Sequence, residues 1–386
     1  MDISANLPGR GYGRVRIREG IIDGIDRMGP ERAGEPYLAP GLIDIQLNGF
    51  AGVDFSAPNL EPEQLIAMLP ELWRTGLVAF CPTLITNSVE ALSRNFRVLE
   101  QARRLDARFA LAVPCYHLEG PYLSPGPSHG AHDPHWMHPP DWEEFCRLQQ
   151  AAGGRIGIVT IAPELPGACE FIRRAAEQGV IVSIGHTDGG PRDVHQAVLA
   201  GARLSTHLGN GCPQQIDRHA NPIWAQLAAG ELAASIICDT FHLPEDLVRV
   251  VARMKGIERT ILITDATHVA TLPPGRYSLV GVPIELLPGG KVVRVDGNCL
   301  AGSAVTMNRA VTVFRQYTGL ALAEALAAAA TAPARLLARP QLCAELAPGE
   351  RANLILCRPE PDALAIDRLW LGGEVLHANT ADGLSS

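Results

Sequence analysis

Eight short apolar runs occur along the middle of the chain, and polar or helix-like segments separate each run from the next. The runs are continuous rather than alternating in polarity, which is typical of parallel strands that are covered on both faces. Eight repeats of a strand and a helix predict an α/β fold, the (β/α)8 TIM barrel. The predicted strands are Leu42–Leu47, Leu77–Leu84, Phe109–Leu118, Ile156–Ile161, Val180–Ile184, Ala202–Thr206, Ala233–Cys238 and Thr260–Thr264.

The segments between these runs predict the helices that surround the barrel. Several begin with residues that favour a helix start, such as Asp193 and the Pro244-Glu245-Asp246 cluster. The Ala-rich stretch Ala321–Ala338 predicts the eighth helix, because Ala has the highest helix propensity. The other predicted helices are Glu61–Arg74, Val89–Leu105, Asp141–Ala152, Ala168–Glu177, Pro191–Ala200, Pro222–Ala229 and Glu245–Lys255.

Both ends of the chain differ from this middle part, because they contain short Val/Ile segments and turn residues. Such segments predict short β-strands, and Pro40-Gly41 marks a boundary after the first of the two regions. We therefore expect one small β-sandwich domain formed by both termini, residues 1–40 plus 345–386. The barrel domain is expected to span residues 41–344.

The composition excludes several classes of protein. Of 386 residues, 47% are apolar and 19% are charged, which fits a globular chain and not a disordered one. The net charge is −8 and no basic cluster is present, so a nucleic-acid partner is not expected. No apolar stretch approaches the ~18 to 20 residues of a membrane span, and the N-terminus lacks the pattern of a signal peptide. Nine cysteines without a CxxC pair indicate reduced thiols and a cytoplasmic protein.

Ionisable side chains follow four of the predicted strands. Glu119, His186, His207 and Asp265 each lie where an apolar run ends, and the active sites of such barrels lie at these ends. A ring of polar turn residues on the barrel is the structural alternative, since strand ends also collect turn residues. Four such groups are costly beside apolar strands unless they are paired or bind a ligand.

A metal ion accounts for this set of residues. One Glu oxygen and two His nitrogens suit Zn²⁺ and leave a fourth position for water. The metal lowers the pKa of bound water to about 7 and polarises a carbonyl group. Asp265 is then the expected general base, which takes the proton of the water and passes it to a leaving amine.

The residues that are missing favour a single metal ion. Binuclear barrel hydrolases often carry a His-x-His pair on the first strand, where this chain has Gln46-Leu47-Asn48. Others bridge two metals through a carboxylated lysine, but the only lysines are Lys255, in a predicted helix, and Lys291, in a predicted loop or hairpin. We also expect Glu164, at the end of the fourth strand, to be structural.

Several of these motifs, in this order, resemble those of the N-acetylglucosamine-6-phosphate deacetylases of the amidohydrolase superfamily. The similarity extends from about Pro40 to Gly349. The matching segments are Pro40–Gly49, Gly52–Phe55, His117–Pro125, Gly130–His132, Thr160–Glu164, Gly185–Thr187, Thr206–Leu208, Thr264–Ala266 and Leu300–Ser303.

The resemblance implies roles for individual residues. Glu119, His186 and His207 match the ligands of one divalent metal ion per chain, Zn²⁺ or Fe²⁺, and Asp265 matches the catalytic acid/base. The positions that match substrate-binding residues are His132, Asn210, Gly211, Arg218 and His242.

Some of these positions imply more about the substrate and the assembly. Asn210 and Gly211 match a pair that holds the sugar phosphate. Arg218 matches an arginine that reaches the phosphate bound by a neighbouring subunit, and the family is commonly a homodimer. The segment around Arg218, Asp217-Arg218-His219-Ala220-Asn221-Pro222, departs from the Arg-Glu-Pro-Gly pattern of the family.

The expected reaction is removal of the N-acetyl group from an amino sugar, N-acetylglucosamine 6-phosphate, to give the free amine and acetate. One alternative is a related amidohydrolase that acts on a different N-acyl or cyclic amide, because the altered loop lies where the phosphate would bind. A second is a non-catalytic metal-binding scaffold, although Asp265 would then have no reason to accompany the ligands.

Overall fold

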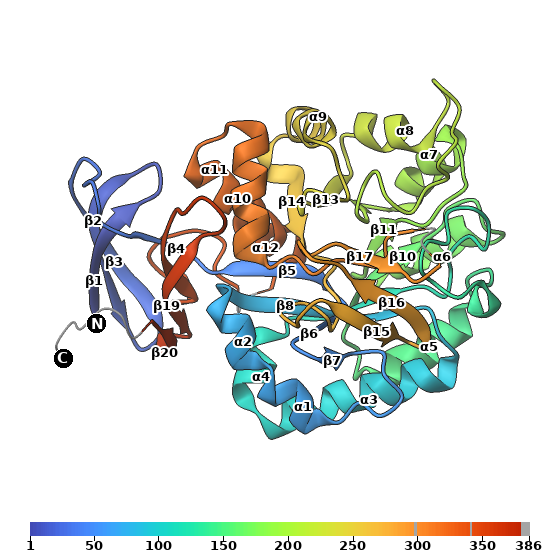
Figure 1. Ribbon diagram of the computed structural model, residues 1–386, viewed down its shortest axis with the longest axis horizontal. Coiled ribbons are helices and arrows are strands. Elements are labelled where there is room, and N and C mark those ends of the chain that lie inside the picture. The colour runs from blue at the N-terminus through green and yellow to red at the C-terminus, as the bar shows by residue number, and fades with distance from the viewer. Residues whose placement is uncertain (297–298, 340–341, 380–386) are drawn as a thin grey trace.

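In the computed structural model, eight parallel strands form a nearly closed barrel (Figure 1). Their order is β14-β13-β12-β11-β10-β9-β8-β5. The ends approach each other where the Asp265 N–H donates to the Gln46 carbonyl oxygen at 3.0 Å. The strands are β5 (Leu42–Leu47), β8 (Leu77–Ile85), β9 (Tyr116–Glu119), β10 (Ile156–Ile161), β11 (Ile181–Ile184), β12 (Leu204–Ser205), β13 (Ala233–Ile237) and β14 (Thr260–Ile263). The predicted barrel is confirmed.

The structure describes residues 1–296, 299–339 and 342–379. The last part of the predicted C-terminal segment, residues 380–386, lies outside this range. Within the described residues, no helix is long and apolar enough to cross a membrane.

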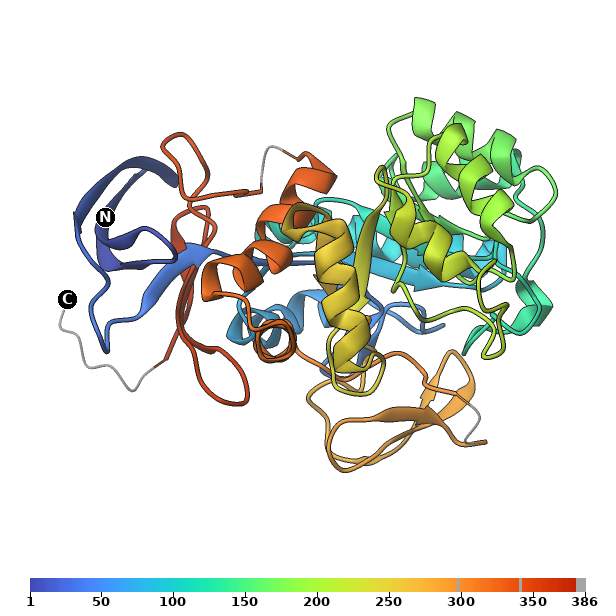
Figure 2. The same cartoon turned by 90° about the horizontal axis from the view of Figure 1, so that it is seen from above.

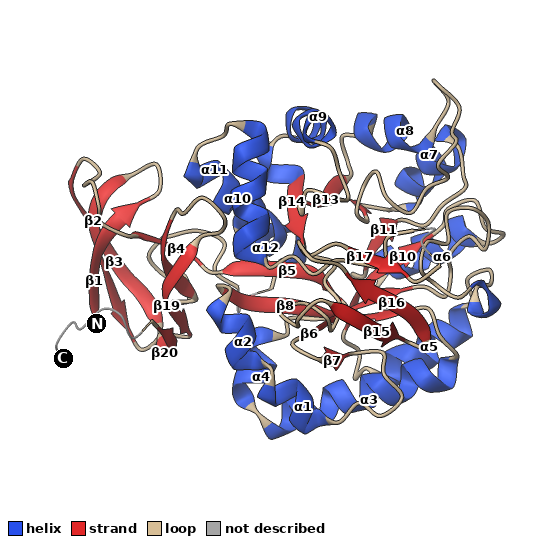
Figure 3. Ribbon diagram, in the orientation of Figure 1, coloured by secondary structure: helices blue, strands red, loops and turns tan. Residues whose placement is uncertain are grey.

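Helices surround the barrel, as Figure 3 shows. Four have the predicted bounds: α3 (Val89–Leu105), α6 (Ala168–Glu177), α7 (Pro191–Ala200) and α9 (Glu245–Lys255). The bounds of α5 (Trp142–Ala151) and α8 (Pro222–Ala228) differ from the prediction by one residue at one or both ends. The predicted helix 61–74 forms two pieces, α1 (Pro62–Ala67) and α2 (Leu69–Arg74). Pro70 explains the break, because proline cannot donate the backbone hydrogen bond that would continue the helix.

The prediction of one strand over Phe109–Leu118 is wrong in its first half. Residues Ala107–Ala112 form helix α4, and only Tyr116–Glu119 form β9. Asp106 starts the helix, because its side chain accepts hydrogen bonds from the N–H groups of Arg108 and Phe109. A short buried helix and a buried strand have the same apolar pattern, so the sequence does not distinguish them.

The single helix predicted over Ala321–Ala338 is also wrong. Two helices occupy this stretch, α11 (Leu322–Ala329) and α12 (Thr331–Leu337), and the backbone breaks at Ala330 with φ −134° and ψ −66°. Pro333 accounts for the break, since its ring would clash with the carbonyl group four residues earlier. A further helix, α10 (Met307–Thr318), precedes them and was not predicted.

Strands from both ends of the chain form one mixed sheet of seven strands, at the left of Figure 1. Its order is β20-β19-β18-β4-β1-β2-β3, and β1 pairs parallel with β4 while the other pairs are antiparallel. Leu7, Val15 and Trp370 pack in its own apolar core. The small β-domain built from both termini is confirmed, while its exact boundaries stay a prediction. The strands are β1 (Asp2–Leu7), β2 (Gly11–Arg18), β3 (Ile21–Gly29), β4 (Tyr37–Pro40), β18 (Leu354–Arg358), β19 (Ala365–Leu371) and β20 (Glu374–Ala378).

A three-stranded antiparallel sheet follows β14 and projects from the barrel in Figure 2. It consists of β15 (Gly275–Leu279), β16 (Val282–Leu286) and β17 (Val292–Arg294). Lys291 lies in the connection between β16 and β17, in agreement with its predicted place in a loop or hairpin. A two-stranded hairpin, β6 (Gly49–Phe50) and β7 (Val53–Asp54), follows β5.

Candidate metal centre and active site

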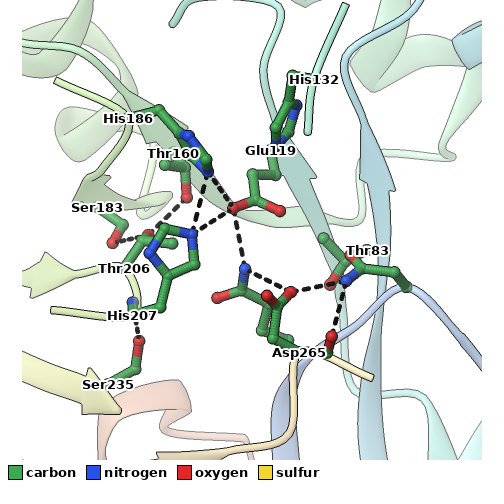
Figure 4. Close-up of polar contacts among 12 residues, drawn as sticks. Thr83, Glu119, His132, Thr160, Ser183, His186, Thr206, His207, Ser235 and Asp265 are labelled. Carbon is green, nitrogen blue, oxygen red and sulfur yellow. Dashed lines mark hydrogen bonds and ion pairs between the residues drawn. The ribbon is translucent and has the colours of Figure 1, made fainter. Parts of the chain in front are cut away.

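Three predicted ligands converge at the carboxyl end of the barrel (Figure 4). Glu119 is the last residue of β9, and His186 and His207 lie just beyond β11 and β12. The Glu119 Oε1 atom is 3.3 Å from His186 Nε2 and 3.0 Å from His207 Nε2. The two Nε2 atoms are 3.1 Å apart, and all three side chains are buried.

This group fits a divalent metal ion. The ligand atoms of Glu119, His186 and His207 lie within 4.8 Å of one another, and it is the one such group among the described residues. Two nitrogens and one carboxylate oxygen are a typical donor set for Zn²⁺ or Fe²⁺. Burial opposes ionisation of Glu119, but the adjacent imidazoles of His186 and His207 outweigh it and hold the pKa of this carboxyl group well below its usual value.

A neighbouring loop determines the tautomer of His186. The Nδ1 atom of His186 lies 2.9 Å from the carbonyl oxygen of Ser128. Because a carbonyl oxygen only accepts, Nδ1 carries the proton and Nε2 presents its lone pair to the group. The buried Nδ1 of His207 has no hydrogen-bond partner among the described residues, so no neighbour prevents its Nε2 from presenting a lone pair as well.

The backbone at these positions is strained. His186, His207 and Asp265 have φ values of +48°, +32° and +50°. Residues other than glycine rarely adopt this left-handed region, and such strain is concentrated at functional sites. The strained backbone occurs at the strand ends, where the chain turns sharply enough to direct the side chains toward one point.

Asp265 lies beside the three candidate ligands, and two side-chain amides hold its carboxylate. One amide belongs to Gln46 in β5, and the other belongs to Asn48, the residue that follows β5. Asn48 Nδ2 donates to Asp265 Oδ1 at 2.6 Å, and Gln46 Nε2 donates to the same oxygen at 3.2 Å. Gln46 Nε2 also donates to Glu119 Oε1 at 2.9 Å. Burial and the nearby Glu119 charge raise the pKa of Asp265 to about 6, against the opposing effects of His207 and Asn48.

Gln46 and Asn48 belong to the candidate site, because they donate to Asp265 and, in the case of Gln46, to Glu119. The sequence indicated no such role, and the two residues counted only against a second metal because neither is a His. Their polar side chains, within and just after the first strand, were the available signal, since buried amides need hydrogen-bond partners.

A cavity of about 460 Å³ opens above these residues. Apart from the three ligand residues and Asp265, four of the predicted substrate-binding residues line it: His132, Asn210, Gly211 and His242. Arg218 does not line the cavity. It is exposed in the loop between β12 and α8. Apolar side chains form other parts of the wall, among them Ile223, Ile237 and Leu279, and no Arg or Lys is among the described lining residues.

The two predicted substrate histidines are held by different partners. His132 is buried, and its Nδ1 atom lies 2.8 Å from Thr86 Oγ1. Burial and the neighbouring His186 lower the pKa of His132 to about 3, so its ring is neutral. His242 Nδ1 donates to Asp239 Oδ2 at 2.6 Å. Burial raises the pKa of Asp239, but the hydrogen bond from His242 outweighs this and keeps it below its usual value.

Gly211 lies close to both ligand imidazoles. Its φ is +58°, and a Cβ atom there would lie 2.9 Å from His207 Cε1 and 3.1 Å from His186 Nδ1. Glycine therefore suits this position for two reasons, its left-handed backbone and the close approach of the rings.

Comparison with known proteins identifies the family of the chain. Residues 37–377 match the amidohydrolase family. An N-acetylgalactosamine-6-phosphate deacetylase of Escherichia coli O157:H7 is 30% identical over 365 residues, 94% of each chain. An N-acetylglucosamine-6-phosphate deacetylase of Bacillus subtilis (strain 168) is 33% identical over 318 residues, 78% of each chain.

A solved structure agrees as well. A variant of the N-acetyl-D-glucosamine-6-phosphate deacetylase of Mycobacterium smegmatis, in complex with N-acetyl-D-glucosamine-6-phosphate, superposes with a TM-score of 0.88. It is 28% identical, and the match covers 97% of this chain and 99% of that one. The chain therefore belongs to the amidohydrolase family and, within it, to the deacetylases of N-acetylglucosamine 6-phosphate and N-acetylgalactosamine 6-phosphate.

Proposed function

We propose that this protein removes the N-acetyl group from an amino sugar 6-phosphate and releases the free amine and acetate, with N-acetylglucosamine 6-phosphate as its first substrate. The observation that carries the proposal is the buried group of Glu119, His186 and His207 beside Asp265, at the floor of one cavity. The named activities of relatives that match 78% to 94% of the chain support it.

In this proposal one divalent metal ion, Zn²⁺ or Fe²⁺, is held by Glu119, His186 and His207. The bound ion lowers the pKa of water and polarises the amide carbonyl group. The donor set supports one ion per chain, because the first strand offers the amides of Gln46 and Asn48 instead of imidazoles.

Asp265 is the proposed acid/base. Its carboxylate accepts a proton from the attacking water and later donates that proton to the departing amine nitrogen. Burial and the Glu119 charge raise the pKa of Asp265, which makes its carboxylate a better proton acceptor than an exposed one. Asn48 and Gln46 hold the carboxylate in place, and His132 or His242 stabilises the negative charge that develops on the carbonyl oxygen.

We assign substrate binding to the remaining cavity residues. Asn210 and Gly211 would hold the sugar phosphate at the wall of the cavity. Arg218, exposed and outside the cavity, would act on the phosphate bound by a neighbouring subunit of a homodimer. Exposed apolar side chains in and near this loop, Ile216 and Trp224, support an interface there. The nine cysteines are free thiols, which supports a cytoplasmic protein.

Two other substrates follow from specific observations. The Escherichia coli relative acts by name on N-acetylgalactosamine 6-phosphate, so the sugar epimer is a second candidate. The lack of an Arg or Lys among the described lining residues favours an uncharged N-acyl or cyclic amide if the chain acts alone.

The test is acetate release by the metal-loaded protein from both 6-phosphorylated N-acetyl sugars, unphosphorylated N-acetylglucosamine and an N-acetyl amino acid. We expect turnover of a phosphorylated sugar with kcat/KM at least 100-fold above that of its unphosphorylated form. Hydrolysis of only the N-acetyl amino acid would support the alternative amidohydrolase. A protein with bound metal that hydrolyses none of these substrates would contradict the proposal.

A further inference from the structure

Glu164, expected to be structural, contacts the turn that follows one of the candidate metal ligands. It lies just beyond β10, and its carboxylate accepts two hydrogen bonds from the residues after His186. Thr187 Oγ1 donates to Glu164 Oε2 at 2.5 Å, and the Asp188 N–H donates to Oε1 at 2.7 Å. Both donors belong to the two residues immediately after His186, so the carboxylate holds the chain where it leaves this ligand.

The local backbone is shaped for this contact. A Cβ atom on Gly189 would lie 2.9 Å from Glu164 Oε2, so glycine leaves room for the carboxylate. His186 has the unfavourable φ of +48°. A residue in this region keeps its conformation only when its surroundings impose it, and the two hydrogen bonds to Glu164 supply such a constraint on the adjoining peptide groups.

The same turn also contacts both loops that surround the His186 ring. Asp188 accepts hydrogen bonds from Ser124 Oγ at 2.6 Å and from the Ser128 N–H at 3.1 Å. Ser128 is the residue whose carbonyl oxygen accepts the His186 Nδ1 proton at 2.9 Å. On the other side, the Thr187 N–H donates to the Gly211 carbonyl oxygen at 3.1 Å.

We propose that Glu164 is a positioning residue for the metal centre: it holds the Thr187-Asp188 turn so that His186 keeps both its strained backbone and its ring orientation. Glu164 does not touch the ligand atoms, and it acts through His186. Because the partners that orient ligating imidazoles typically change metal affinity by about 10-fold to 100-fold, loss of the carboxylate should weaken metal binding.

The experiment compares Zn²⁺ binding to the full-length apoprotein and its variants in competition with a chelator. We expect Glu164→Ala to raise the Kd for Zn²⁺ about 10-fold to 100-fold. Glu164→Gln should have a smaller effect, because its amide oxygen still accepts the Asp188 N–H. The control is Glu170→Ala. Glu170 is an exposed residue of helix α6, and among the described residues its one ion pair is with Arg173. This variant should leave the Kd for Zn²⁺ unchanged.

A second measurement separates positioning from general stability. The ¹⁵N spectrum of the histidine rings reports the His186 tautomer, which a purely structural role of Glu164 would not change. We expect the Nδ1–H signal of His186 to weaken or shift in Glu164→Ala. A lower Tm together with a Zn²⁺ Kd within twofold of the wild type and an unchanged His186 signal would overturn the proposal. These measurements need no substrate, so their outcome is independent of whether the proposed deacetylase activity is found.

Discussion

Asn48→Leu tests whether the hydrogen bond to Asp265 sets the pH at which the proposed base works. Leu preserves the approximate size of the side chain but removes the donor that lies 2.6 Å from Asp265 Oδ1. A hydrogen bond to a charged group contributes about 1.5 to 3 kcal/mol. Since one pKa unit corresponds to about 1.4 kcal/mol, the pKa of Asp265 should rise by about one to two units.

The assay is the pH dependence of kcat/KM for acetate release, whose acidic limb reports the base of the free enzyme. The acidic limb of the variant should therefore lie about one to two pH units above that of the wild type. At a pH within the acidic limb of the wild type, activity of the variant should fall about 10-fold and recover at higher pH.

Asn95→Leu is the matched control for this variant. Asn95 is also buried, but its Nδ2 atom donates to the carbonyl oxygens of Phe55 and Ala57, which do not titrate. Its removal should lower the Tm and leave the acidic limb in place. If Asn48→Leu leaves the limb within a few tenths of a unit of the wild type, the hydrogen bond does not control the base and the reasoning is refuted.

Three further predictions concern the base, a buried carboxyl group and the assembly. Asp265→Asn should lower kcat by about 10²-fold to 10⁴-fold, while metal analysis still finds about one ion per chain; near-normal kcat, or two tightly bound ions, would contradict the assignment. Asp44 is fully buried, and burial raises its pKa to about 7. The folded state therefore binds this proton more tightly than the unfolded chain, so stability is lost as the pH rises through 7. In urea unfolding of the apoprotein, the free energy of unfolding falls between pH 5 and pH 8, and Asp44→Asn should reduce this fall by about 3 kcal/mol. The same fall in the variant and the wild type would contradict the raised pKa of Asp44. Trp224→Asp should convert a dimer into a monomer in light scattering if the exposed Trp224 lies in the proposed interface, and a wild type that is already monomeric would rule out that interface.

Local pattern predicted much of the barrel because continuous apolar runs alternate with helix-like segments along the chain. It failed where these two patterns are not distinct. The run from Phe109 onward is mostly apolar, and the Asp106 cap starts a helix there instead of a strand. The Ala-rich segment has high helix propensity along its length, yet Pro333 divides it.

The candidate ligands could be predicted for a related reason. Glu119, His186 and His207 each interrupt an apolar run at its end, and parallel strands bring these ends to one edge. The hydrogen bonds around them could not be predicted. Glu164 had no evident partner in the sequence, because its partners Thr187 and Asp188 are reached only through the packing of β10 beside β11.

The amino-acid sequence by itself therefore determined the alternation of strands and helices and the kinds of side chain that meet at the barrel mouth, since both depend on local order. Only the tertiary structure decided how those side chains are held. Asn48 and Asp265 are 217 positions apart, and they meet because the barrel closes with β5 beside β14. Closure and strand register are properties of the whole sheet. In the sequence, Gln46 and Asn48 only occupy positions where a second metal site would need histidines, whereas in the closed barrel they donate hydrogen bonds to the proposed base.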